Sequence, residues 1–162
     1  LLEKTEQFDQ AEKIVRNILA KDPDSARAHN YLGYFMLERD MELDQAYEHI
    51  KKAAKLEPKD PYIRDSLGWY YYKTGKLERA LKEIKKAWKE SSDDMVITKH
   101  LAIIYKEMKQ YSKAKKYYLE ALKLTSSENE REEVISELEE LENIRLPASE
   151  KEKKTSKGLS KN

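Results

Sequence analysis

Apolar residues recur along much of the chain at intervals of three and four, which places them on one face of a helix. The pattern is clearest where Leu77, Ala80, Ile84 and Ala87 follow one another at spacings of 3, 4 and 3. The same spacings recur in three more segments, which run from Phe8 to Ile18, from Leu43 to Ala53 and from Tyr111 to Ala121. Each of these four segments is therefore predicted to be an amphipathic helix.

A second kind of segment precedes three of these helices and carries a small residue directly after a leucine. The pairs are Leu32-Gly33, Leu67-Gly68 and Leu101-Ala102. These pairs recur about every 34 residues, a period typical of arrays with two antiparallel helices per repeat. Gly75 is expected to form the turn between two such helices, because a positive φ is favourable only for glycine. The corresponding turn at residues 39–42 carries one extra residue.

This repeat divides the chain into units. They are a half repeat at residues 1–25, complete repeats at 26–60, 61–94 and 95–127, a capping helix at 128–146 and a disordered Lys-rich tail at 147–162. Within the half repeat, we expect residues 1–4 to end a first helix and residues 8–21 to form a second one. The capping helix is predicted because Val134, Leu138 and Leu141 share one face and glutamates coat the rest.

The repeated positions resemble the tetratricopeptide repeat family over residues 1–125. The matching residues are Leu32-Gly33, Ala46, Ile50, Ala53 and Pro58, then Leu67-Gly68, Tyr71, Ala80, Ile84 and Ala87, then Leu101-Ala102, Tyr105, Ala114, Tyr118 and Ala121. The tryptophan often found three positions before the leucine is replaced by His29, Arg64 and Thr98. The resemblance implies an all-α, right-handed α-solenoid of antiparallel helix pairs. It also implies a scaffold whose first helices line a concave groove for a peptide or a partner's helix.

Two runs, NYLGYFMLERDMELDQA and DSLGWYYYKTGKLERAL, are similar to bacterial tetratricopeptide lipoproteins of the cell envelope. In that group the array assembles proteases or cell-wall hydrolases. This narrower resemblance implies a location in the bacterial periplasm or envelope, with the cytoplasm as the alternative. The chain begins with Leu1 and not with methionine, so we expect the natural protein to extend further at its N-terminus.

The repeat geometry indicates which side chains face the groove. They are Asn30, Tyr31 and Tyr34 of the first complete repeat, Tyr62, Asp65, Ser66, Trp69 and Tyr72 of the second, and Lys99, His100, Ile103 and Lys106 of the third. Aromatic side chains with a polar tip offer a large contact area and dominate binding hot spots. The alternative is that the aromatic residues only pack against neighbouring repeats. Tyr70, Tyr71 and Trp88 are expected to lie in the core.

The composition excludes several function classes. Charged residues make up 39% of the chain, but the net charge is only +1. The overall charge therefore does not favour binding to nucleic acid or to an anionic membrane. The sequence has no cysteine and no apolar run long enough to span a membrane. His29, His49 and His100 do not form a metal-binding set, and no phosphate-loop or nucleophile motif occurs. We therefore expect no metal, no cofactor and no catalytic residue.

The sequence thus predicts a non-catalytic protein–protein interaction scaffold that binds a peptide or a partner helix in its aromatic groove. The alternative is a structural array that self-assembles into homo-oligomers. In that case the apolar surface near Leu2 and Ile18, at the N-terminal face, would mediate the contact. The partner is expected to be a protein and not a nucleic acid.

Overall fold

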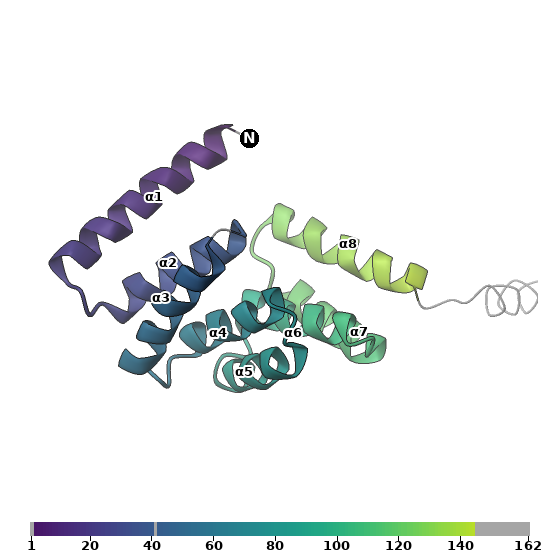
Figure 1. The fold of residues 1–162 in the computed structure, drawn as a ribbon. Helices are drawn as coiled ribbons and strands as arrows, with labels where there is room; N and C mark the ends of the chain where they lie inside the picture. Colours follow the sequence, from purple (N-terminus) through teal and green to yellow (C-terminus); the bar gives the residue numbers. More distant parts are fainter. Residues whose placement is uncertain (1, 41, 145–162) are drawn as a thin grey trace, which may run out of the picture. The chain divides into compact units, whose positions relative to one another are not determined.

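The computed structural model describes residues 2–40 and 42–144, and it describes side chains from residue 9 onward. All regular secondary structure in these residues is helical, which confirms the predicted all-α class (Figure 1). The helices are α1 (Leu2–Lys21), α2 (Ala26–Glu38), α3 (Leu43–Leu56), α4 (Pro61–Lys73), α5 (Leu77–Glu90), α6 (Met95–Glu107), α7 (Tyr111–Leu124) and α8 (Glu128–Ile144). The predicted tail at 147–162 lies outside the described residues.

The helices belong to two compact units, unit 1 (Leu1–Ser92) and unit 2 (Asp93–Asn162). In unit 1, α2 lies beside α3 and α4 lies beside α5, each pair joined by a short turn (Figure 1). The glycine of each first helix makes the close approach possible. A Cβ on Gly33 or on Gly68 would lie 2.6 Å from Cγ1 of an isoleucine on the paired helix, Ile50 and Ile84 respectively. Both isoleucines are completely buried as a result.

Side chains cap the starts of the first helices. Ser25 accepts a hydrogen bond from the amide of Ala28 before α2, and Asp94 accepts one from the amide of Ile97 before α6. Asp60 accepts from two amides, and Pro61 follows it as the first residue of α4. These caps satisfy amides that have no partner within the helix, so they fix where each first helix begins.

The turns between paired helices use left-handed backbone. Gly75 has φ of +74°, as predicted for the turn between α4 and α5. Lys109 takes the corresponding place between α6 and α7 with φ of 58°, where a side chain costs about 1 kcal/mol. The longer turn after α2 places both Asp40 and Glu42 at positive φ. The extra residue is therefore absorbed by the turn and not by the helices.

Helix α1 differs from the sequence prediction. The predicted break between residues 4 and 8 was wrong, because α1 is one continuous helix of 20 residues. Residues 2–8 contain neither glycine nor proline, and leucine, glutamate, lysine and glutamine are good helix formers. Nothing in this segment therefore favours a turn, and the helix continues to the residues before Pro23.

In unit 2, α6 pairs with α7, and α8 packs against α7 (Figure 1). Ala102 takes the place of the glycines, and Tyr118 of α7 takes the place of the isoleucines and is fully buried. On α8, Val134 is also fully buried, and Ile135 beside it is half-buried.

Candidate functional site: the aromatic face of unit 1

One face of α2 and one face of α4 together carry most of the predicted groove residues of unit 1. We call the aromatic face the set Tyr31, Tyr34 and Glu38 of α2 with Tyr62, Trp69 and Tyr72 of α4. On each helix these residues recur at spacings of three, four or seven, so they share one side. Tyr31 is 48% exposed and Tyr62 is 54% exposed. These two tyrosines offer the most accessible aromatic surface of the set.

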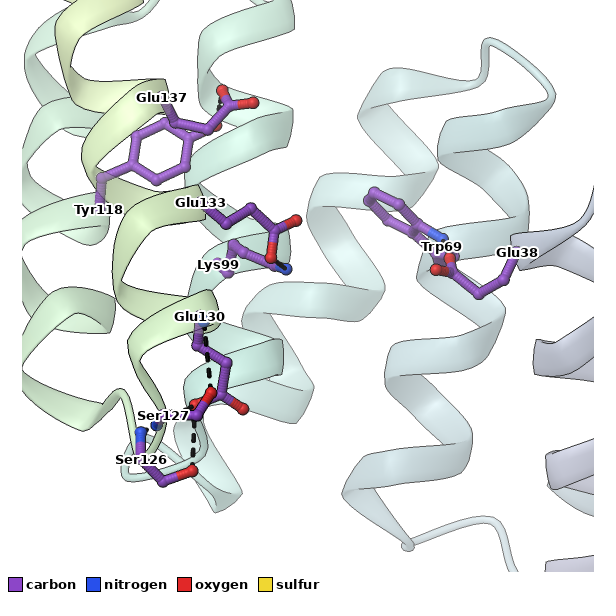
Figure 2. Close-up of polar contacts among 9 residues, drawn as sticks. All are labelled: Glu38, Trp69, Lys99, Tyr118, Ser126, Ser127, Glu130, Glu133 and Glu137. Atoms are coloured by element: carbon purple, nitrogen blue, oxygen red, sulfur yellow. Dashed lines mark hydrogen bonds and ion pairs between the residues drawn. The ribbon is translucent and has the colours of Figure 1, made fainter. Parts of the chain in front are cut away.

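Trp69 lies on the predicted side of α4, but it is not an exposed groove residue. Its side chain is only 7% exposed, and its indole Nε1 donates a hydrogen bond to Oε1 of Glu38 at 2.8 Å (Figure 2). Its ring stacks on the ring of Tyr72 with 4.5 Å between centroids. A buried indole needs an acceptor for its N–H, and α2 supplies it. The structure therefore favours packing between repeats for most of the Trp69 surface, while Tyr72 stays half-buried.

The polar residues predicted to line this part of the groove are mostly buried. Asp65 and Ser66 are both inaccessible, and Ser66 Oγ donates to the carbonyl of Tyr62 at 3.1 Å. Their predicted exposure to a ligand was therefore wrong. Asn30 is half-buried, and within the described residues its Oδ1 has no hydrogen-bond partner. The helical period predicted which helix carries these residues, but it did not predict that their side chains are buried.

The predicted groove lysines of α6 contact the chain's own helix α8. Lys99 pairs with Glu133 at 3.0 Å, as drawn in Figure 2. Lys106 pairs with Glu137 at 2.8 Å and with Glu140 at 2.6 Å. His100 is buried and Ile103 is half-buried. In unit 2, therefore, the residues expected to meet a ligand hold a capping helix instead.

Glu137 of α8 contacts both α6 and α7, because it also accepts a hydrogen bond from the hydroxyl of Tyr118 at 2.8 Å (Figure 2). Burial pushes the pKa of Glu137 up, but the hydrogen bonds from Lys106 and Tyr118 outweigh burial and leave that pKa below its ordinary value. Burial likewise pushes the pKa of Lys106 down, and its bonds to Glu137 and Glu140 raise it above the ordinary value. Both pKa shifts favour the charged forms, and therefore the ion pair between Glu137 and Lys106.

The start of α8 carries a reciprocal cap that the sequence prediction missed. Glu130 accepts from the amides of Ser126 at 2.8 Å and Ser127 at 3.1 Å, and its own amide donates to Ser127 Oγ at 3.3 Å (Figure 2). The amide of Ser126 is the main reason why the pKa of Glu130 lies below its ordinary value. The Ser-x-x-Glu spacing at residues 127–130 is the signature of such a capping box and was readable from the sequence.

His29 and His49 form a pair that the sequence did not predict. Their Nδ1 atoms lie 2.8 Å apart, and Nε2 of His29 lies 3.0 Å from the carbonyl oxygen of Pro23. Because a carbonyl only accepts, Nε2 of His29 carries a proton, and a neutral His29 then accepts at Nδ1 from His49. Burial is the main reason why the pKa of His49 is lowered, and the nearby His29 adds to it.

The residues that the structure describes hold neither a metal site nor a membrane-spanning helix. In that part of the chain, no three histidine, cysteine, aspartate or glutamate side chains converge as metal ligands. None of the described helices has the length and apolar character needed to cross a membrane. The aromatic face of unit 1 is the feature that best fits a binding surface.

Two sequence models of the tetratricopeptide repeat match the chain, at residues 1–61 and at residues 100–128, which together exceed half of it. TPR repeat-containing protein PA4667 of Pseudomonas aeruginosa is 42% identical over 96 residues, which are 59% of this chain and 16% of that protein. Mitochondrial import receptor subunit TOM70 of Homo sapiens is 25% identical over 114 residues, which are 70% of this chain and 19% of TOM70. The chain thus spans less than a fifth of these curated relatives.

Solved structures show the same fold. PilF of Pseudomonas aeruginosa matches with a TM-score of 0.67 and 22% identity, over 98% of this chain and 72% of that chain. TTC0263, a thermophilic TPR protein of Thermus thermophilus, matches with a TM-score of 0.66 and 23% identity, over 82% of this chain and 74% of that chain. At these identities the likeness concerns the fold alone, and it confirms the predicted helical solenoid. The chain belongs to the tetratricopeptide repeat family.

Proposed function

We propose that the aromatic face of unit 1 binds an extended peptide or a helix of a partner protein, and that the chain is a non-catalytic scaffold. The fold supports a protein–protein interaction scaffold in general, and tetratricopeptide repeat proteins generally bind proteins without catalysing a reaction. One relative, TOM70, is by name a receptor subunit. A role in receiving another polypeptide is consistent with that relationship.

The exposure of Tyr31 and Tyr62 is the observation that carries this proposal. Each tyrosine leaves about half of its side chain accessible, on neighbouring helices that contact each other. Tyrosine in an interface contributes a large contact area while few rotatable bonds are frozen. Further along α4, Trp69 and Tyr72 are held by stacking, and Trp69 also by its bond to Glu38, so the surface is largely preformed. A preformed surface loses less entropy when it binds.

The experiment is a selection followed by measurement on variants. A library of displayed random peptides is selected against the full chain, and affinities of the selected peptides are measured by fluorescence anisotropy. The test variant is Tyr31→Ala/Tyr62→Ala. The matched control is Leu56→Ala/Leu119→Ala, which removes two similarly exposed apolar side chains from α3 and α7, each the second helix of its repeat. Circular dichroism confirms that both variants are folded.

Loss of two hot-spot tyrosines should weaken binding about tenfold or more, because each such side chain contributes roughly 1 kcal/mol or more. The control variant should bind as the unaltered chain does. If the selected peptides bind the Tyr31→Ala/Tyr62→Ala variant with unchanged affinity, the aromatic face is not the binding surface. If only the control variant binds the peptides more weakly, the binding site lies on the second helices of the repeats, such as α3 and α7.

Helix α1 supports a second candidate function, self-association into homo-oligomers. Ile14 is 60% exposed and Ile18 is 44% exposed. The residues that correspond to Ile18 in α3, α5 and α7 are Ala53, Ala87 and Ala121, and all three are fully buried. The end of the apolar stripe at Ile18 is therefore exposed on α1, although Val15 of the same stripe is buried. Together with the neighbouring Ile14 it forms an exposed apolar surface, which favours association.

Light scattering over a dilution series tests this candidate. An Ile14→Glu/Ile18→Glu variant should remain monomeric at concentrations where the unaltered chain associates. Ile14→Leu/Ile18→Leu, which keeps the stripe apolar, is the control and should associate. A monomer at all concentrations for the unaltered chain would exclude self-association through α1, and it would leave peptide binding by the aromatic face untouched.

A further inference from the structure

The carboxylate of Glu38 lies at the edge of a stack of two aromatic rings. Its Oε1 accepts the indole hydrogen bond of Trp69 at 2.8 Å (Figure 2). The Trp69 ring is stacked on Tyr72 with an angle of 19° between the planes. The side chain of Glu38 is exposed, and the structure gives it no other hydrogen bond among the described residues. One carboxylate oxygen is therefore engaged, and the other accepts no hydrogen bond from the described residues.

The cations nearest to Glu38 in the sequence or on the facing helix are paired with other carboxylates. Arg39 pairs with Asp9 at 3.3 Å, and Lys73 pairs with Asp40 at 2.9 Å. No lysine or arginine of the described residues pairs with Glu38. Arg27 shares this side of α2, but it lies roughly 16 Å away along the helix axis at 1.5 Å per residue. The negative charge of Glu38 is thus left without a cation of its own.

A carboxylate beside aromatic faces is the arrangement that recognises a cation. The ring quadrupole attracts a positive charge, and a guanidinium both stacks on a ring and donates hydrogen bonds to a carboxylate. An apolar ligand residue at this place would instead cover Glu38 and leave a charge without compensation, which is unfavourable. Tyr72 is half-buried, so part of its side chain beside Trp69 stays accessible.

We propose that Glu38, Trp69 and Tyr72 bind an arginine side chain of the partner peptide. This inference rests on the proposed function, because it assigns a ligand residue to one end of the aromatic face. The guanidinium donates to the second oxygen of Glu38 and packs against the accessible part of Tyr72. Trp69 keeps the carboxylate in place through its indole N–H. Arginine fits better than lysine, since its planar group stacks and donates at the same time.

The test uses the full chain labelled with ¹⁵N and two small probes. N-acetyl-arginine methylamide is compared with N-acetyl-citrulline methylamide, which has nearly the same shape and no charge. The chain has two tryptophans, so the spectrum has two indole N–H signals, and Trp88 is the internal reference. The arginine probe should move the Trp69 signal and leave the Trp88 signal in place. Its apparent affinity should exceed that of the citrulline probe about fivefold, as a partly exposed cation–π contact predicts.

Three variants separate charge from packing. Glu38→Gln keeps an acceptor for the Trp69 indole but removes the charge, and it should reduce the arginine response to that of citrulline. Tyr72→Leu should reduce it as well, whereas Tyr72→Phe should retain it. Equal responses to both probes, an unmoved Trp69 signal, or an unchanged response in Glu38→Gln would overturn the proposal. If peptides still bind through Tyr31 and Tyr62 in that case, the proposed function stands and only the arginine assignment is lost.

Discussion

The hydrogen bond between Tyr118 and Glu137 provides a direct test of how α8 is held in unit 2. The change is Tyr118→Phe, which removes one hydroxyl from a completely buried ring and keeps the ring itself. No cavity larger than the oxygen is made, so the loss of packing is small. What changes is that Glu137 loses its donor from α7 and keeps only its partner from α6, Lys106.

The magnitude follows from the geometry. A hydrogen bond to a charged group contributes about 1.5–3 kcal/mol to stability, and the lower part of that range applies where the acceptor is partly solvated. The side chain of Glu137 is 31% exposed and still contacts Lys106, so we expect a loss of about 1.5 kcal/mol. Urea denaturation followed by circular dichroism should show a midpoint lower by about 0.5–1 M.

The pKa shift of Glu137 predicts how the cost of Tyr118→Phe changes with pH. The pKa of Glu137 is lowered in the folded chain, so its stabilisation is fully present above its ordinary pKa and is lost as the pH falls through the lower, folded value. The cost of Tyr118→Phe should therefore be largest at pH 7 and shrink at pH 3. The control is Tyr105→Phe, a buried tyrosine of α6 that stacks on Tyr117 and should cost less. A cost that is equal at both pH values, or no larger than the control's, would refute this account of the bond.

Three further outcomes follow from other contacts. Gly68→Ala should destabilise unit 1 by about 1–2 kcal/mol in urea denaturation, because overpacking against Ile84 outweighs the better helix propensity; Gly68→Ala combined with Ile84→Ala should cost less than the two changes added. The pKa of His49 is lowered, so stability is highest above its ordinary pKa and falls as the pH drops below it; His49→Gln should flatten the thermal stability measured between pH 7 and pH 5. Glu130→Ala, which removes the acceptor, should speed amide hydrogen exchange at Ser126 and Ser127, and an unchanged rate would contradict the cap.

Periodicity predicted the helices and the packed core because both depend on backbone geometry that repeats. Gly33 and Gly68 indicated where helices approach closely, and the structure shows an isoleucine side chain filling that space in both cases. The same reasoning failed for α1, where the repeat register predicted a turn but residues 2–8 contain no turn-forming residue. Local propensity decided the structure there, not the register of the repeat.

The side-chain contacts between helices could not be predicted from the period of the sequence in the same way. Trp69 and Tyr72 are three residues apart and lie on the same side of α4, yet one is 7% exposed and the other is half-buried. That difference depends on the position of Glu38 on another helix. Likewise, α8 carries many glutamates, and only the packed structure shows that Glu133, Glu137 and Glu140 meet the lysines of α6. Side-chain reach between helices is not encoded in the period of either helix.

The two units use equivalent positions of their first helices in different ways, and this is why we assign ligand binding to unit 1. In unit 2 the side of α6 that corresponds to the aromatic face carries Lys99 and Lys106, and the glutamates of α8 neutralise both. In unit 1 the corresponding side carries two half-exposed tyrosines and Glu38, to which no lysine or arginine of the described residues is paired. A surface whose charges are already compensated gains little from a charged ligand. A surface with an open aromatic area and an uncompensated carboxylate gains from a ligand that supplies both an apolar stem and a cation, which is the chemistry of an arginine side chain.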